Sequence, residues 1–141
     1  MLSALEHIAD KYPEKCEIVK VESLPYTEYQ QAMNGSDVIL DQLYSYTPSM
    51  NSLLAMSKGI IVVGGGEPEN YQILNETKLR PIINVEPTYD SVCQQLEWLI
   101  SNPQQINQLK ADSISYTKKH HDYKKVALKY EAMYKSLLQQ S

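Results

Sequence analysis

The stretch that decides the fold runs from Ser36 to Tyr71 and reads SDVILDQLYSYTPSMNSLLAMSKGIIVVGGGEPENY. A short apolar run at 38–40 and a β-branched run at 60–63 predict two strands. The apolar residues around Met56 predict a helix between them, which Gly59 ends. A strand, a helix and a second strand joined by short links predict a parallel βαβ unit. Because the second strand is β-branched throughout, we expect both of its faces to be buried.

The loops that follow these two strands are the candidate ligand site. In an open parallel sheet, ligands bind at the carboxyl ends of the strands, and free amides at helix starts suit phosphates. We therefore expect ligand contacts within two groups of residues that lie at this edge. They are Asp41, Gln42, Tyr46, Ser49, Met50, Asn51, Gly64, Gly65, Gly66 and Glu67.

Most of these residues also have a purely structural interpretation. The triplet Gly64–Gly66 serves a tight turn equally well, although three glycines exceed what a turn needs. Asp41 and Gln42 could brace their own loop through hydrogen bonds. Ser49 is a good helix N-cap, and Glu67 would suit the positive end of the next helix. The sequence leaves these alternatives open.

The rest of the chain continues the alternation of helices and strands. Helical spacing of apolar residues begins at Leu2, and Pro13 ends that helix. Asn102 and Pro103 suit the start of a late helix, and Asp122 suits the start of the last one, in which Val126, Tyr130, Met133 and Leu137 share a face. The further predicted elements are strands at 16–21 and 81–85 and helices at 26–33 and 91–100. We therefore expect one α/β domain over residues 1–141, with a Rossmann-like parallel sheet flanked by helices.

Composition excludes several classes of function. The chain has 141 residues, a net charge of −4 and a pI near 5.3, which argues against nonspecific nucleic-acid binding. No apolar run is long enough to span a membrane, and the N-terminus does not resemble a signal peptide, so we expect a cytoplasmic protein. Cys16 and Cys93 are far apart in sequence and are interpreted as reduced core thiols.

Metal and dinucleotide sites are not expected. His120 and His121 are adjacent, so they point to different sides of a helix, and no third ligand stands at a suitable spacing. The glycine triplet is not G-x-G-x-x-G, the dinucleotide fingerprint, so no cofactor is predicted. The lysines around the histidines, at 118–119 and 124–125, are interpreted as a solvated helix face, with anionic lipid as the alternative contact.

A family resemblance appears in the same stretch. Leu53–Val63, LLAMSKGIIVV, is similar to the run LEAMA-x-G-x-PVV that ends the E-x7-E motif of retaining GT-B glycosyltransferases. Asp37–Leu43, DVILDQL, resembles the ADV-x-x-DQL variant of a bacterial branch, and Glu67–Tyr71 resembles the loop after that branch's fifth strand. Tyr46 and Leu54 stand where the two motif glutamates would be.

The resemblance implies that this chain is the C-terminal, nucleotide-sugar-binding half of a longer bacterial enzyme. That enzyme would transfer a sugar from a nucleotide-activated donor to an acceptor hydroxyl. Contact with a donor-sugar hydroxyl is the ligand-binding alternative for Glu67, beside its structural place at a helix start. The family's first strand, its basic diphosphate loop and its N-terminal acceptor domain have no counterpart here, so the chain alone is expected to be inactive. A missing first strand would leave open sheet edges, which favour a homodimer. A membrane-peripheral parent enzyme also fits the resemblance.

Two other classes remain open. A noncatalytic Rossmann-like binding module would explain the loss of the motif carboxylates. A flavodoxin-like regulatory domain is less consistent with the sequence, because a receiver needs clustered acidic residues at the ends of its first strands. No residue is an evident general base, and no Ser-His-Asp or Cys-His arrangement has support from local motifs.

Overall fold

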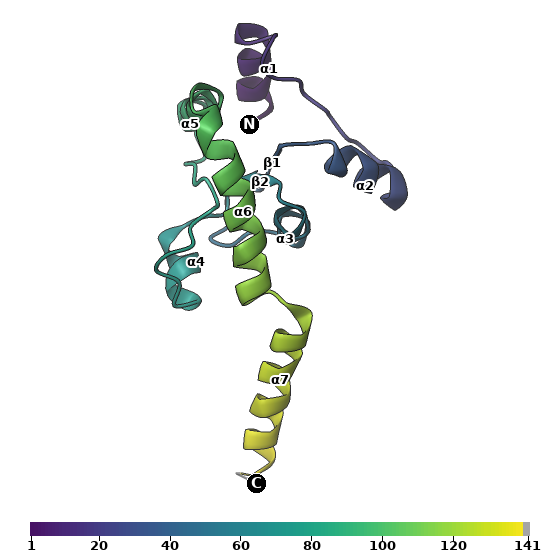
Figure 1. The fold of residues 1–141 in the computed structure, drawn as a ribbon, viewed down its shortest axis with the longest axis vertical. Coiled ribbons are helices and arrows are strands. Elements are labelled where there is room, and N and C mark those ends of the chain that lie inside the picture. Colours follow the sequence, from purple (N-terminus) through teal and green to yellow (C-terminus); the bar gives the residue numbers. More distant parts are fainter. Residues whose placement is uncertain (140–141) are drawn as a thin grey trace.

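The computed structural model describes residues 1–139 and has an α/β fold in which helices surround a small parallel sheet (Figure 1). The helices and strands within the described residues are α1 (Leu2–Lys11), α2 (Tyr26–Asn34), β1 (Val38–Leu40), α3 (Met50–Ser57), β2 (Ile61–Val63), α4 (Pro68–Ile73), α5 (Tyr89–Ser101), α6 (Pro103–His120) and α7 (Tyr123–Leu138). The predicted βαβ unit is confirmed, because β1 and β2 are parallel and α3 joins them. In the register, Val38 pairs with Ile61 and Leu40 with Val63.

The predicted strand at 81–85 is reduced to a single parallel bridge between Ile83 and Val63. Two backbone hydrogen bonds hold it: Ile83 N donates to Val62 O at 2.9 Å, and Gly64 N donates to Ile83 O at 2.8 Å. Pro81 lacks an N–H, which limits how far the ladder can extend toward that end. The chain here lies beside β2 without forming a full third strand.

The strand predicted at 16–21 does not form. Residues 16–22 follow the turn after α1 as chain without regular structure, and Cys16 Sγ contacts the carbonyl oxygens of Ile8 and Tyr12. A strand needs a partner for its backbone groups, and within the described residues nothing pairs with this segment. Cys16 and Cys93 are free cysteines, and both are half-buried.

One edge of β1 is open. Ile61 N donates to Asp37 O and Asp41 N donates to Val63 O, so alternate residues of β1 face β2. The backbone groups of Val38 and Leu40 therefore point to the other edge, where no strand lies among residues 1–139. An edge with two free donors and two free acceptors is a template for pairing with another strand.

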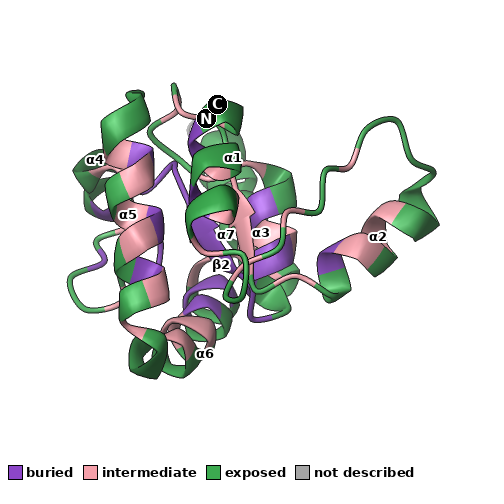
Figure 2. Cartoon of the chain, turned by 90° about the horizontal axis from the view of Figure 1, so that it is seen from above, coloured by how far each residue is buried: buried purple, intermediate pink, exposed green. Residues whose placement is uncertain are grey.

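The core lies on both faces of β2, which is fully buried as predicted (Figure 2). Ile61 and Val63 pack with residues of α1 and α5, and Val62 packs with Met56 of α3 and Tyr116 of α6. β2 is thus a central strand covered by helices on both sides, whereas the residues of β1 are only half-buried.

The helix boundaries follow the predicted capping residues, with one difference. Ser49 caps α3 by accepting from Ser52 N, and Asp122 caps α7 by accepting from two backbone amides. Gly59 ends α3 with φ of 78°, the left-handed conformation that glycine allows. Asn102 stands before Pro103 at the start of α6, as predicted, but its side chain instead donates to Trp98 O of the preceding helix at 2.8 Å.

The first helix packs against the body of the molecule, whereas the last helix does not. α1 packs on α5 through Ala4 and Ile8, and Lys11 Nζ lies 2.6 Å from Glu97 Oε1, although an irregular segment at 12–25 follows α1. α7 extends away from the body of the molecule, and none of its residues is buried (Figure 1). Within residues 1–139, no helix has the length and apolar character that a membrane span requires.

Candidate functional site

The two loops of the candidate site meet at the carboxyl ends of β1 and β2. The paired strand ends Leu40 and Val63 place the loop after β1 beside the glycine triplet. A Cβ at Gly64 would lie 3.3 Å from Gln42 O, and a Cβ at Gly65 would lie 3.1 Å from Thr47 O. The structure therefore brings the sequence-predicted residues of both loops into one place.

The glycine triplet is buried under this contact. Gly64 and Gly65 have φ values of 106° and 70°, which side-chain-bearing residues rarely adopt. Gly66 has no room for a side chain, because a Cβ there would lie 2.8 Å from Ile82 Cγ2. Close approach of the 41–48 loop and of Ile82 accounts for all three glycines, so their backbone is not bare to solvent.

Asp41 and Ser49 brace the loop around the start of α3. Asp41 Oδ2 accepts from Ser49 N at 2.7 Å, and Ser49 Oγ accepts from Ser52 N at 3.2 Å. These bonds satisfy two of the amides at the helix start. The two amides between them, those of Met50 and Asn51, have no hydrogen-bond acceptor among the described residues. They are the donors that this edge offers to an anion.

Exposed side chains border these amides. Met50 is 80% exposed and Tyr46 67% exposed, and the Gln42 and Asn51 side chains are also exposed. Glu67 is half-buried and stands at the N-cap of α4, where its side chain makes no capping bond. The site is thus an open surface with amide donors, a ring and two carboxylates, of which Asp41 is bonded to Ser49 N, and its described residues include no general base beside a reactive group.

A hollow of about 480 Å³ lies elsewhere, at the opposite end of the sheet. It is lined by residues of the α2–β1 link, the α3–β2 link and α6, among them Asp37, Lys58 and Lys110. Both lysines are engaged: Lys110 Nζ lies 2.5 Å from Asp37 Oδ1, and Lys58 Nζ donates to Asn34 Oδ1 at 2.5 Å. No predicted site residue lines this hollow.

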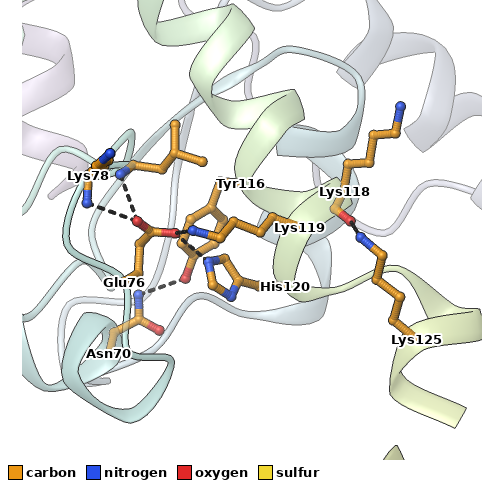
Figure 3. Close-up of polar contacts among 9 residues, drawn as sticks. Asn70, Glu76, Lys78, Tyr116, Lys118, Lys119, His120 and Lys125 are labelled. Carbon is orange, nitrogen blue, oxygen red and sulfur yellow. Dashed lines mark hydrogen bonds and ion pairs between the residues drawn. The ribbon is translucent and has the colours of Figure 1, made fainter. Parts of the chain in front are cut away.

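Sequence reasoning missed a buried polar cluster that joins the loop after α4 to the end of α6 (Figure 3). The Glu76 side chain is 1% exposed and makes four contacts. Its Oε2 lies 2.5 Å from Lys119 Nζ and 2.6 Å from His120 Nε2, and its Oε1 accepts from the amides of Lys78 and Leu79. The Lys119 and His120 side chains lower the pKa of the Glu76 carboxyl far below its usual range, with help from the two amides.

Aromatic and amide side chains extend the cluster. Asn70 Nδ2 donates to Tyr116 Oη at 2.9 Å, and the Tyr116 ring lies 5.1 Å from the ring of His120. Burial raises the pKa of Tyr71 to about 12, and the same cause raises the pKa of Tyr116. Burial, followed by the nearby His120, lowers the pKa of His121.

The four lysines near residue 120 are exposed, as expected for a solvated helix face, and two of them also make contacts within the chain. Lys119 is paired with Glu76, and Lys125 Nζ donates to Lys118 O across the α6–α7 junction (Figure 3). Two of the four lysines therefore hold the structure together. Glu76 lies in a polar loop, and Lys119 comes 43 residues later, so no sequence pattern indicates that their side chains meet.

The comparisons with known proteins do not assign the chain. No protein-family model matches it, and no curated protein matches it either.

Proposed function

We propose that this chain is the nucleotide-sugar-binding half of a bacterial GT-B glycosyltransferase, with a Rossmann-like fold. The observation that carries the proposal is the meeting of the two loops at the carboxyl ends of β1 and β2, beside the free amides of Met50 and Asn51. A parallel strand pair with a helix start at this edge suits a nucleotide diphosphate. The resemblance of Leu53–Val63 to the family motif gives the choice of donor class.

In this proposal the residues of the edge bind the donor and do not act as acid or base. The diphosphate accepts from the α3 amides, which stabilise the charge that develops on the leaving group. Tyr46 offers a flat ring to the sugar or base, and Glu67 offers a carboxylate to a sugar hydroxyl. Acceptor binding belongs to a second domain, and the location of the reaction is the cytoplasm.

The open edge of β1 supports a further part of the proposal, an incomplete sheet. Val38 and Leu40 present unpaired backbone groups, and the segment at 16–22 has no strand partner. In the proposed family a first strand would lie between them. In the isolated chain a second copy can supply that strand, which gives a homodimer. Sedimentation equilibrium measures this, and a monomer at high micromolar concentration would contradict it.

A noncatalytic binding module is the second candidate. Leu54 stands where the second motif glutamate would contact the ribose, and it packs against the cluster of Met33, Ala55 and Ile60. An apolar side chain that belongs to the core cannot replace that contact. This module would keep the diphosphate site at α3 and lose the donor-sugar contacts.

Nucleotide titration with NMR detection tests both candidates. With a panel of UDP, GDP and ADP, we expect shifts at residues 41–51 and 64–67 and weak binding, with a Kd of about 1 mM. The variant Asn51→Asp places a carboxylate at the helix start and should weaken binding while the helix is retained. Asn107→Asp makes the same change on the exposed surface of α6 and should bind like the parent.

The sugar moiety separates the two candidates. If a UDP- or GDP-sugar binds more tightly than the bare diphosphate, and Glu67→Gln removes the difference, the glycosyltransferase proposal is supported. Equal affinity for both would favour the noncatalytic module. Shifts centred on residues 118–125, or none anywhere at millimolar ligand, would refute the site itself.

A further inference from the structure

The C-terminal helix α7 is an exposed amphipathic helix. None of its residues is buried, although it carries seven large apolar side chains that are at least 46% exposed. These are Tyr123, Leu128, Tyr130, Met133, Tyr134, Leu137 and Leu138. So many exposed apolar groups on one helix mark an interaction surface.

The apolar residues form one continuous face. At about 100° per residue, all but one of the large apolar residues of α7, together with Val126 and Ala127, fall within an arc of about 140°. Leu128 is the exception and lies on the opposite side. The face is wider than the seam of a two-stranded coiled coil and contains Tyr123, Tyr130 and Tyr134. Tyrosine suits a boundary between apolar and aqueous surroundings.

Lysines border this face on both sides. Lys124 lies along one border, next to Glu131, and Lys129 lies along the other. Lys135, which is paired with Glu131, and Lys125, which donates to Lys118 O, lie farther round the helix. Six of the 13 lysines and arginines of the chain, but only two of its 17 acidic residues, lie between residues 118 and 139. This part therefore has a net charge of +4 and residues 1–117 have −8. The positive part extends from an acidic body (Figure 1).

We propose that α7 binds an anionic membrane surface, with its apolar face toward the acyl chains and its lysines toward the headgroups. An interfacial helix needs a wide apolar face, basic residues along its borders and interfacial aromatic residues, and α7 has all three. Pairing of two α7 helices would instead bring two positive segments together. The charge distribution favours the lipid surface over a second copy.

Vesicle co-sedimentation of the whole chain tests this proposal. We expect binding to phosphatidylcholine vesicles that contain about 30 mol% phosphatidylglycerol, and little binding to phosphatidylcholine alone. Raising the salt concentration from about 50 mM to about 500 mM should weaken the binding, because it screens the lysines. Equal binding to both vesicle types, or none to the anionic ones at low salt, would overturn the proposal.

Matched variants locate the contact. Tyr130→Ser with Met133→Ser should reduce binding by at least about tenfold, whereas Leu128→Ser, on the opposite side of α7, should not. Lys124→Gln with Lys129→Gln should reduce it by about 30-fold, and Lys15→Gln with Lys20→Gln should not. Circular dichroism confirms that each variant is folded.

Two results would contradict the assignment of this face. Equal loss in Leu128→Ser would show that the apolar face is not the contact. A dimer in sedimentation equilibrium that Tyr130→Ser with Met133→Ser abolishes, in a protein that binds no vesicles, would assign the face to a second copy. The proposal is independent of nucleotide binding, so its failure leaves the proposed function untouched.

Discussion

Glu76 and His120 are 44 residues apart in sequence, yet their side chains meet at 2.6 Å and both are nearly buried. Lys119 joins the same carboxylate oxygen, so one acidic group receives two basic groups from the last turn of α6. The contact ties the loop after α4 to the point where α6 ends and α7 begins (Figure 3). Loss of the Glu76 carboxylate would leave the buried His120 ring without its partner, whereas the Lys119 side chain is 53% exposed.

Glu76→Gln should therefore destabilise the protein clearly. The amide keeps the size of the side chain but removes the charge that Lys119 and His120 share. We expect the midpoint of thermal unfolding to fall by about 5–10 °C, measured by circular dichroism. Glu14→Gln, an exposed acid in a turn, is the control and should change the midpoint little. Equal midpoints for the two variants would show that the cluster does not stabilise the fold.

The same group predicts a loss of stability in acid. Since the folded-state pKa of Glu76 is lower than the ordinary value of 4.5, its carboxyl stays ionised to a lower pH in the folded chain than in the unfolded chain. Its contribution is fully present above the unfolded pKa and declines as the pH falls toward the folded pKa. Urea unfolding at pH 7, 4 and 3 should show the parent and Glu76→Gln converging as the pH falls. A constant difference over that range would contradict the assignment.

Gly66→Ala should destabilise the loop through packing. The added methyl group would lie 2.8 Å from Ile82 Cγ2 and 3.1 Å from Ile82 O, and the backbone oxygen cannot easily move away. We expect the free energy of unfolding to fall by about 1–3 kcal/mol in urea titrations. Gly35→Ala is the matched control, because its new Cβ meets nothing closer than 3.7 Å at an α-helical φ of −87°. The control should be neutral or slightly stabilising.

The isolated chain should show no glycosyl transfer. The described residues of the candidate site include amide donors, a ring and two carboxylates, but no evident general base and no basic diphosphate loop. Purified chain incubated with a panel of nucleotide sugars and simple acceptors should release no more nucleotide diphosphate than buffer does, as measured by a coupled assay. Transfer above that background would show that a catalytic group lies within these residues.

The central βαβ unit could be predicted from the sequence, because local signals agreed there. β-Branched residues predicted β2, Ser49 marked the start of α3, and Gly59 marked its end. The predictions of full strands at 16–21 and 81–85 were wrong. Their local pattern is suitable, but a strand also requires a neighbour with free backbone groups, and a pattern within one segment does not reveal that neighbour.

The candidate site, too, could be predicted only in part. Its location followed from the topology of parallel strands, whereas the role of each residue depended on contacts between loops. Asp41 was expected to bind ligand or to brace its loop, and the bond to Ser49 N shows the bracing role. The partnership of Glu76 with Lys119 and His120 could not be predicted, because no spacing rule links residues so far apart.

The docking of α1 on α5 has a consequence for proteolysis. A helix of 10 residues is not stable by itself in water, so α1 depends on its packing partner and on the chain at 12–25 that keeps it close. A protease that cuts within 12–25 would turn an intramolecular contact into a bimolecular one. The freed peptide would dissociate on dilution and expose Val92, Leu96 and Leu99 to water. An uncut chain at residues 12–25 thus keeps the apolar core covered by α1 and away from solvent.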